Sequence, residues 1–377
     1  MSNNLTVISP GRINLIGEHI DYNGGVVLPS AIDLNIVLKM VKNGTDRCNI
    51  KSENFKSGFS LDLTAIEKST FQWHNYIIGV ISEIQEFFPH RISGFDCTIK
   101  SGLPMGSGIS SSAALECGIA KGLNELFEIG LSDQQMIKIS RNAEHSFVGT
   151  KCGIMDQFAV VMGKKGKLIK LDCKTMEHDY VETDFAPYRI LLLNTNVSHN
   201  LASSEYNTRR GECSAALSAI NKNARANYSF LCDVPMEHLE SIKSILPKDI
   251  YNRALYVLQE KSRVLNAIKA LNNGNLNLFG EYLYRTHDGL QHLYEVSCDE
   301  LNFLVDFSKR YPEVLGSRMM GGGFGGCTIN LVHGDILNEY VKNVSLAYFR
   351  EFNLRLTAIT VNLADGVIIK QHGAKTR

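Results

Sequence analysis

Apolar residues recur at helical spacing in several long segments of the chain. Ile77, Ile81 and Ile84 fall on one side of the segment 75–88, which predicts a helix there. The same pattern predicts further helices over 110–127, 132–147, 203–222, 251–272 and 276–310. The second of these opens with a capping box that begins at Ser132.

Alternating or continuous apolar runs rich in β-branched residues predict strands elsewhere. They cover 5–8, 26–40, 95–99, 168–172, 190–194, 327–332 and 357–370, and an Asp365-Gly366 turn is expected to fold the last into a hairpin. Helices and strands are mixed without regular βαβ alternation, which favours an α+β fold. Strands dominate before about 173–190 and helices after it, so we expect two domains, 1–180 and 181–377.

The composition is that of a globular protein, with 377 residues of which 44% are hydrophobic. Lys+Arg and Asp+Glu balance at 39 each, so no net field favours nucleic acid or an anionic membrane as a partner. No apolar run approaches the ~18 residues of a membrane span, and the N-terminus does not resemble a secretory signal. Nine scattered cysteines without Cys-x-x-Cys predict reduced thiols in a cytoplasmic protein rather than disulfides or structural zinc.

The segment 10–22, Pro-Gly-Arg-Ile-Asn-Leu-Ile-Gly-Glu-His-Ile-Asp-Tyr, concentrates polar side chains beside an apolar run. It brings Arg12, Glu18, His19 and Asp21 within ten residues. Carboxylates accept, arginine donates and histidine does either, which suits a small ligand covered in hydroxyls. The alternative is a strand that ends in a solvated turn, and this segment alone leaves both interpretations open.

A glycine-rich loop at 102–108 runs into three serines, Ser110 to Ser112, at the start of a predicted helix. Glycines let the backbone curl around an anion, and a helix N-terminus offers unpaired N–H groups and the positive end of its dipole. The loop lacks the lysine of a Walker P-loop. The alternative is a serine-capped helix after a flexible turn, but three serines exceed what capping requires.

A second glycine cluster, Gly321 to Gly326, matches the pattern Gly-x-Gly-x-x-Gly of dinucleotide-binding folds. That fingerprint must open a helix, whereas the residues that follow here read as a strand. We therefore expect a turn that lets the backbone approach another loop or a ligand closely, and we disfavour a Rossmann dehydrogenase.

Two acidic residues follow the first glycine loop. Glu144 lies near the end of a predicted helix and could pair with a lysine or hold a metal. Asp156 interrupts an otherwise apolar run and is either a helix cap or a functional group. An arginine such as Arg12 beside it would favour the ionised carboxylate.

Taken together, these motifs resemble those of a known family. Residues 10–22 resemble the galactokinase signature, and 104–115 resemble the ATP loop of the GHMP small-molecule kinases. The segment 317–327 is similar to the third motif of that superfamily. The similarity extends through 152–158 and 203–210, in family order over most of the chain.

The resemblance implies a sugar 1-kinase that transfers the γ-phosphoryl of Mg-ATP to the anomeric hydroxyl of D-galactose. It implies the two-domain GHMP fold, with the site in a cleft between an N-terminal α+β domain and a C-terminal ferredoxin-like α+β domain. It further implies Mg²⁺ as cofactor, galactose and ATP as the small-molecule partners, and a monomer.

By similarity, the sugar would be bound by Arg12, Glu18, His19, Asp21, Gly153, Asp156 and Tyr206. ATP would lie against Trp73, Tyr76, Gly106, Ser107, Gly108, Ser110, Ser111 and Ser112. Ser112 and Glu144 would hold magnesium, Asp156 would be the general base, and Arg12 would keep it ionised and stabilise the transferring phosphoryl.

One position departs from the family pattern. Ser198 stands where relatives carry a basic residue, which removes a cation from this loop unless the neighbouring His199 partly substitutes. Two alternatives keep the fold: a kinase of another sugar such as N-acetylgalactosamine, and a regulatory relative that binds galactose and ATP without turnover. The intact serine loop, Glu144 and Asp156 argue against the latter.

Overall fold

A six-stranded sheet carries the N-terminal unit in the computed structural model, which describes residues 4–104, 106–198 and 202–371. Its order is β13-β1-β3-β6-β4-β5; β4 and β6 pair in parallel and the other neighbours pair antiparallel. The strands are β1 (Asn4–Asn14), β3 (Pro29–Lys42), β4 (Arg47–Ser52), β5 (Ser57–Asp62), β6 (Phe95–Ser101) and β13 (Ile368–Gln371).

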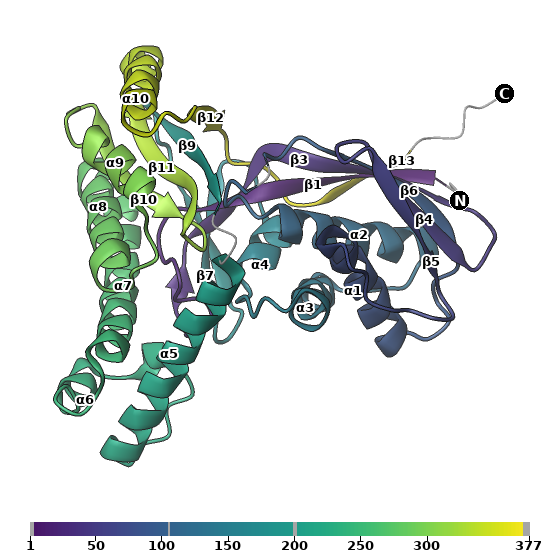
Figure 1. Ribbon diagram of the computed structural model, residues 1–377, viewed down its shortest axis with the longest axis horizontal. Helices are drawn as coiled ribbons and strands as arrows, with labels where there is room; N and C mark the ends of the chain where they lie inside the picture. Colours follow the sequence, from purple (N-terminus) through teal and green to yellow (C-terminus); the bar gives the residue numbers. More distant parts are fainter. Residues whose placement is uncertain (1–3, 105, 199–201, 372–377) are drawn as a thin grey trace.

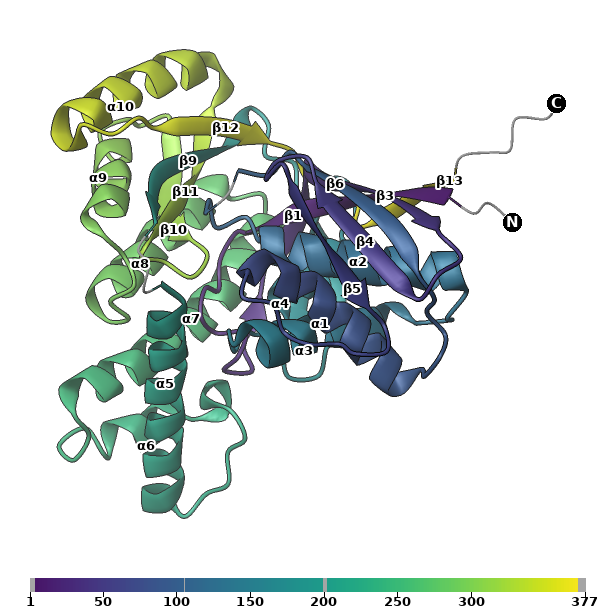
Figure 2. The ribbon, with the colours of Figure 1, turned by 45° about the vertical axis from the view of Figure 1, so that its right-hand side comes forward.

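Helices cover one face of this sheet (Figures 1 and 2). They are α1 (Gln72–Phe87), α2 (Ser111–Phe127), α3 (Asp133–Ala143) and α4 (Met155–Met162), with a π-helical turn at Glu144–Val148 after α3. A small sheet of β2 (Val26–Val27), β7 (Lys167–Asp172) and β8 (His178–Glu182) flanks the unit. The predicted helices over 75–88 and 110–127 are thus confirmed to within a few residues.

The C-terminal unit is built, in the part of the chain described, on a four-stranded antiparallel sheet in the order β10-β11-β9-β12. Its strands are β9 (Tyr188–Ser198), β10 (Val314–Met320), β11 (Gly325–His333) and β12 (Thr357–Val361). Helices follow the first and third strands, which gives the ferredoxin-like βαββαβ arrangement that the resemblance implies. The α+β fold class predicted from the pattern is confirmed.

The helices after β9 are α5 (Ala202–Ala224), α6 (Met236–Glu240), α7 (Lys248–Asn272), α8 (Leu276–His292) and α9 (Asp299–Ser308). Two single turns of 3₁₀-helix lie at Leu231–Asp233 and Gly334–Ile336. The segment predicted as one helix over 276–310 is therefore two helices. A further helix, α10 (Leu337–Phe352), occupies a region that the sequence pattern assigned only to strands.

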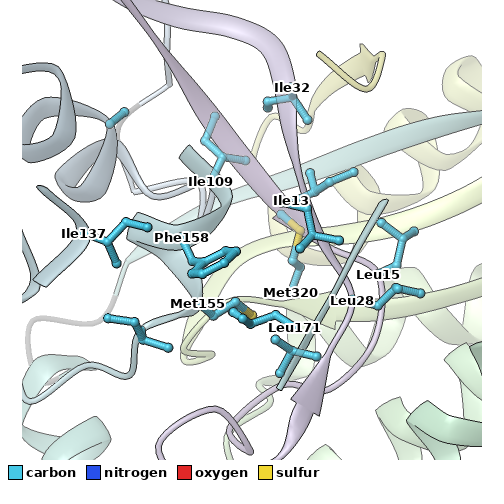
Figure 3. Packing of buried hydrophobic residues seen from close by; sticks show 14 of the residues in the cluster. Ile13, Leu15, Leu28, Ile32, Ile109, Ile137, Met155, Phe158, Leu171 and Met320 are labelled. Atoms are coloured by element: carbon cyan, nitrogen blue, oxygen red, sulfur yellow. The ribbon is translucent and has the colours of Figure 1, made fainter. Parts of the chain in front are cut away.

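One hydrophobic core runs through both units. Ile13 of β1 and Leu15 just after this strand are buried with Phe158 of α4 and Met320 of β10 in the same cluster (Figure 3). Met320 belongs to the C-terminal sheet, so the end of β10 is packed directly against the end of β1. This contact fixes the 10–22 segment relative to the second glycine cluster.

The capping box predicted at Ser132 is present. The Ser132 hydroxyl accepts from the Gln135 backbone N–H, and the Gln135 side chain accepts from the Ser132 N–H at 2.9 Å. This local signal sets the start of α3 without help from distant residues.

The hairpin predicted around Asp365-Gly366 is wrong. Strand β12 pairs with β9 in the second sheet, whereas β13 pairs with β1 in the first. The Asp365 carboxylate instead accepts from the Lys165 N–H at 2.9 Å, and the Gly366 N–H donates to the Gly163 carbonyl at 2.9 Å. The turn residues thus anchor a crossing between sheets, and the last strand of the C-terminal half completes the N-terminal sheet.

A division of the chain into two domains at 180/181 stays a proposal, with β13 as the segment that crosses it.

No helix within the described residues is both long and apolar enough to span a membrane. All nine cysteines lie in the described part of the chain and none forms a disulfide, as their spacing predicts.

Candidate active site

A cavity of about 600 Å³ opens where the two units meet. Its walls come from the end of β1, the loop between β6 and α2, the start of α4, α5 and the second glycine cluster. Every residue to which the resemblance assigns sugar, nucleotide or metal binding lines it: Arg12, Glu18, His19, Asp21, Trp73, Tyr76, Gly106, Ser107, Gly108, Ser110, Ser111, Ser112, Glu144, Gly153, Asp156 and Tyr206. Segments as far apart in sequence as Arg12 and Gly322 therefore meet in one place, although their individual roles remain predictions.

Arg12 and Asp156 form a bidentate ion pair in the wall of this cavity. Arg12 Nε and Nη2 donate to the two Asp156 carboxylate oxygens, each at 2.7 Å. The Arg12 side chain is 5% exposed and that of Asp156 24%, so the carboxylate is the member of the pair that a ligand can reach. The paired N–H groups of a guanidinium match a carboxylate in both spacing and direction.

Asp156 lies in the first turn of α4, but the N-cap position is Ile154. Its carboxylate accepts from Arg12 and from the Ser110 hydroxyl rather than from the helix's own N–H groups. The helix-cap interpretation of Asp156 therefore does not describe its contacts.

Glu18 connects the 10–22 segment to the second glycine cluster. Its carboxylate accepts from Asn14 Nδ2 and, at 2.6 Å, from the Gly321 N–H, and it pairs with Arg318 at 3.2 Å. Gly321 has φ +87°, and a Cβ there would lie 3.2 Å from the Gly108 carbonyl oxygen. The prediction that this cluster allows close approach to another loop is confirmed, and the strand β11 that follows it excludes a Rossmann fingerprint.

Arg318 was not singled out from the sequence, although it supports this wall of the cavity. It is fully buried in β10 and donates to the carbonyls of Asn14, Leu15 (2.8 Å) and Met319 (2.6 Å). In the sequence, only its place in the 317–327 motif indicated a role for Arg318, because its partners Asn14 and Leu15 lie about 300 residues away.

Asp21 and Gly153 are packed against one another. A Cβ at Gly153 would lie 1.8 Å from Oδ2 of Asp21, so only glycine fits at this position. Burial, and secondarily the charge of Asp156, raises the pKa of Asp21 to about 7. Two carboxylates thus face the same end of the cavity.

His19 and Tyr206 complete the polar end. Their ring centroids lie 5.3 Å apart, and burial lowers the pKa of His19 to about 4, so its imidazole is neutral at pH 7. A neutral imidazole can read a hydroxyl through either its N–H or its lone pair.

The glycine–serine loop forms the opposite end. Gly106 and Gly108 adopt positive φ, and α2 starts at Ser111 with no side-chain cap on its first turn. The Ser110 hydroxyl is turned toward Asp156, whereas Ser111 and Ser112 line the cavity beside the uncapped helix N-terminus. Uncapped N–H groups at a helix start favour an anion.

Two carboxylates lie behind Ser112. Gln157 Nε2 donates to Glu144 at 3.1 Å and to Glu116 at 3.3 Å, and Glu116 Oε1 has no hydrogen-bond partner among the described residues. Burial, followed by the charge of Asp156, raises the pKa of Glu144 to about 7, and burial raises the pKa of Glu116 well above its ordinary value. A magnesium ion fits this set, because hydroxyl and carboxylate oxygens are its preferred ligands and its charge would relieve the buried acids.

Glu116 and Gln157 were missed at the sequence level. Glu116 lies one helical turn after Ser112, in the otherwise apolar stretch 113–120, which is the signal that could have found it.

Aromatic residues line the far side of the loop. Trp73 stacks on Phe55 with centroids 5.4 Å apart, and Tyr76 lines the same cavity. Phe55, in the turn between β4 and β5, was also missed, because neither strand was predicted. The expectation for Ser198 and His199 stays untested: His199 lies outside the described residues, and so does the side chain of Ser198.

The chain matches three sequence families in order. Residues 2–40 match the galactokinase galactose-binding signature, 75–164 the GHMP kinases N terminal domain, and 267–341 the GHMP kinases C terminal domain. It is 40% identical to a galactokinase of Thermosipho africanus over 96% of this chain and 99% of that protein. A galactokinase of Clostridium tetani is 42% identical over 95% of this chain and 91% of its own.

Solved structures give the same result. The crystal structure of Lactococcus lactis galactokinase complexed with galactose superposes with a TM-score of 0.93 at 33% identity, covering 97% of this chain and 95% of that one. Methanococcus jannaschii mevalonate kinase, at 17% identity and a TM-score of 0.66, shares the fold over 97% of this chain and 99% of its own.

Proposed function

This chain belongs to the galactokinases of the GHMP kinase superfamily, and on that premise we propose how its cavity performs the reaction. The protein is an ATP-dependent kinase that phosphorylates D-galactose at its anomeric hydroxyl. The observation that carries the mechanism is the position of the Arg12–Asp156 pair, between the hydroxyl-reading residues and the glycine–serine loop. Sugar and nucleotide would meet at this pair.

The sugar would occupy the end of the cavity formed by Glu18, His19, Asp21 and Tyr206. Glu18 is held by two hydrogen-bond donors and one ion pair from the protein, so its orientation is fixed before a ligand arrives. A rigid set of acceptors rejects the wrong hydroxyl direction, because the site's own groups are then left unpaired.

Asp156 would take the proton of the anomeric hydroxyl as that oxygen attacks the γ-phosphorus. Arg12 orients the carboxylate and places positive charge beside the transferring phosphoryl. A loose transition state, in which positioning and charge stabilisation matter most, asks little of the base itself.

The triphosphate would lie on Gly106 to Ser112, and Trp73 with Tyr76 would face the adenine. Ser112 and Glu144 would hold a magnesium ion, which when bound neutralises the phosphate charge. Glu116 and Gln157 would hold Glu144 in place.

An assay of ADP release over several sugars tests this function. We expect galactose to be turned over and glucose, its epimer, at least about 10²-fold less well in kcat/KM, because a hydroxyl pointing the wrong way leaves buried acceptors unpaired. Equal use of glucose would refute the discriminating role of Glu18, His19 and Asp21. Preference for N-acetylgalactosamine would instead support the alternative sugar kinase, and binding of galactose and ATP without turnover would support a regulatory protein.

Removing either proposed magnesium ligand should act on the nucleotide alone. We expect Ser112→Ala and Glu144→Ala to weaken Mg-ATP binding by roughly 10- to 100-fold while galactose affinity stays within twofold, because both side chains lie on the loop side of the cavity. Calorimetry with ATP in the presence and absence of Mg²⁺, and separately with galactose, measures both effects. Loss of galactose affinity with normal Mg-ATP binding would reverse the assignment.

We propose a cytoplasmic monomer. Nine free cysteines suit a reducing compartment.

A further inference from the structure

A chain of hydrogen bonds leads from His19, in the wall of the cavity, into the interior behind it. His19 Nδ1 lies 2.9 Å from the Tyr22 hydroxyl, and this hydroxyl lies 2.7 Å from that of Tyr294. The Tyr294 hydroxyl lies 3.1 Å from Cys213 Sγ, which also accepts from Asn23 Nδ2 at 3.6 Å. Tyr294 and Cys213 are buried, so bulk water does not compete for these bonds.

Each of the four linked groups carries one exchangeable proton at neutral pH. Burial raises the pKa of Tyr22 and of Tyr294 well above the ordinary value and that of Cys213 to about 11, so all three stay protonated. His19, with its pKa lowered to about 4 by burial, is neutral and has its proton on either Nδ1 or Nε2. Four protons are therefore available for three links.

Two arrangements place one proton in every link. In the first, Cys213 donates to Tyr294, Tyr294 to Tyr22, and Tyr22 to Nδ1 of His19, which leaves the imidazole proton on Nε2. In the second, every donor is reversed, so Nδ1 carries the proton and Cys213 Sγ accepts from both Tyr294 and Asn23.

The first arrangement is the better match to the donors and acceptors present. Sulfur is a weak acceptor, and here it accepts once, from Asn23, rather than twice. Among the four linked groups, the imidazole nitrogen is the strongest base, so it is the best hydrogen-bond acceptor. The phenol hydroxyl of Tyr22 is a better hydrogen-bond donor than a neutral imidazole N–H. Nδ1 is therefore the acceptor.

We propose that Tyr22 and Tyr294 are positioning residues that hold His19 as its Nε2–H tautomer, so that His19 presents a hydrogen-bond donor to the sugar. Nε2 is buried and makes no hydrogen bond of good geometry to the residues that the structure describes. The Gly322 backbone lies near the ring and favours its protonated form, but Nε2 stays open to a ligand. A sugar hydroxyl that accepts from Nε2–H must give its own proton to an acceptor, and Glu18 and Asp21 line the same cavity. A fixed donor beside fixed acceptors reads the direction of that hydroxyl. The role toward the sugar rests on the proposed function, whereas the tautomer itself does not.

The tautomer can be measured on the sugar-free protein. Histidine-labelled ¹⁵N protein at pH 7 gives long-range ¹H–¹⁵N correlations that distinguish Nδ1–H from Nε2–H, and the His19 signals are those lost in His19→Asn. We expect the Nε2–H pattern. An Nδ1–H pattern would overturn the proposal whether or not galactose proves to be the substrate.

The hydroxyl chain is tested with Tyr22→Phe and Tyr294→Phe, which keep the rings. We expect the galactose KM to rise about 5- to 10-fold, as for loss of one fixed hydrogen bond, with kcat and the KM for ATP within twofold. The His19 spectrum should shift toward a mixture of tautomers, most in Tyr22→Phe because Nδ1 then loses its direct partner.

Tyr348→Phe is the matched control, since Tyr348 is also fully buried and donates its hydroxyl to the Thr195 carbonyl at 3.0 Å. It should leave galactose KM and the His19 signals unchanged. The proposal would be overturned if the galactose KM rose equally in this control. It would also be overturned if the His19 spectrum were unchanged in both Tyr22→Phe and Tyr294→Phe. If one chain variant does not fold, the other still gives the answer.

Discussion

Asp156→Asn should lower kcat by at least about 10²-fold, the contribution expected of a positioned general base. Asparagine preserves the shape of the side chain, and its carbonyl oxygen in the place of Oδ2 can still accept from Arg12 Nη2 and from the Ser110 hydroxyl. It removes the negative charge and the site that would take the sugar's proton. The galactose KM should change much less than kcat, since the other sugar contacts remain.

Steady-state kinetics measure this effect, and circular dichroism with galactose calorimetry checks that the variant is folded and binds sugar. Asp233→Asn is the matched control: its carboxylate is 27% exposed, close to that of Asp156, and it pairs with Lys174 at 2.8 Å but does not line the cavity. It should keep wild-type turnover. Near-normal turnover in Asp156→Asn would end the base proposal and leave catalysis to positioning and charge alone, which a loose transition state permits.

Residues that act through local sequence were predictable. Arg12, Glu18, His19 and Asp21 crowd into one segment, and an uncompensated polar cluster beside an apolar run is unusual enough to be noticed without a structure. The helix starts were likewise set by nearby residues, as the Ser132 capping box illustrates. The meeting of these residues in one cavity came from the family resemblance, not from spacing.

Residues that support the site from a distance were not predictable. Tyr294 reads as an ordinary core tyrosine, because the partner that gives it a role, Tyr22, lies 272 residues earlier. The Asp365-Gly366 turn failed for the same reason: its local preference for a hairpin is overridden by contacts with Gly163 and Lys165. Single-sequence patterns report periodicity and turn chemistry, and neither contains such pairings.

Arg318→Met should destabilise the protein by about 3–5 kcal/mol, the cost of breaking a buried ion pair by removing one partner. The Arg318 side chain is 0% exposed and that of Glu18 2%, so no water replaces the lost guanidinium. The carbonyls of Asn14 and Leu15 lose their donors as well. Urea denaturation gives the change in unfolding free energy, and galactose binding should weaken with it because Glu18 loses one of the groups that orient it.

Two comparisons separate the buried pair from a general effect of losing an arginine. Arg285 pairs with Glu281 at 3.2 Å, and their side chains are 61% and 58% exposed. Arg285→Met should therefore lower the free energy of unfolding by no more than about 0.5 kcal/mol. In Glu18→Gln/Arg318→Met, the remaining amide is neutral and no longer needs a counter-charge, so the double variant should be more stable than the sum of the single losses implies. Strict additivity would mean that Arg318 stabilises the 14–18 loop only through its bonds to the backbone carbonyls. The prediction would be wrong if Arg318→Met lowered the free energy of unfolding no more than Arg285→Met does. The junction between β1 and β10 would then be held by apolar packing around Met320. Glu18 would be oriented by Asn14 and Gly321 alone.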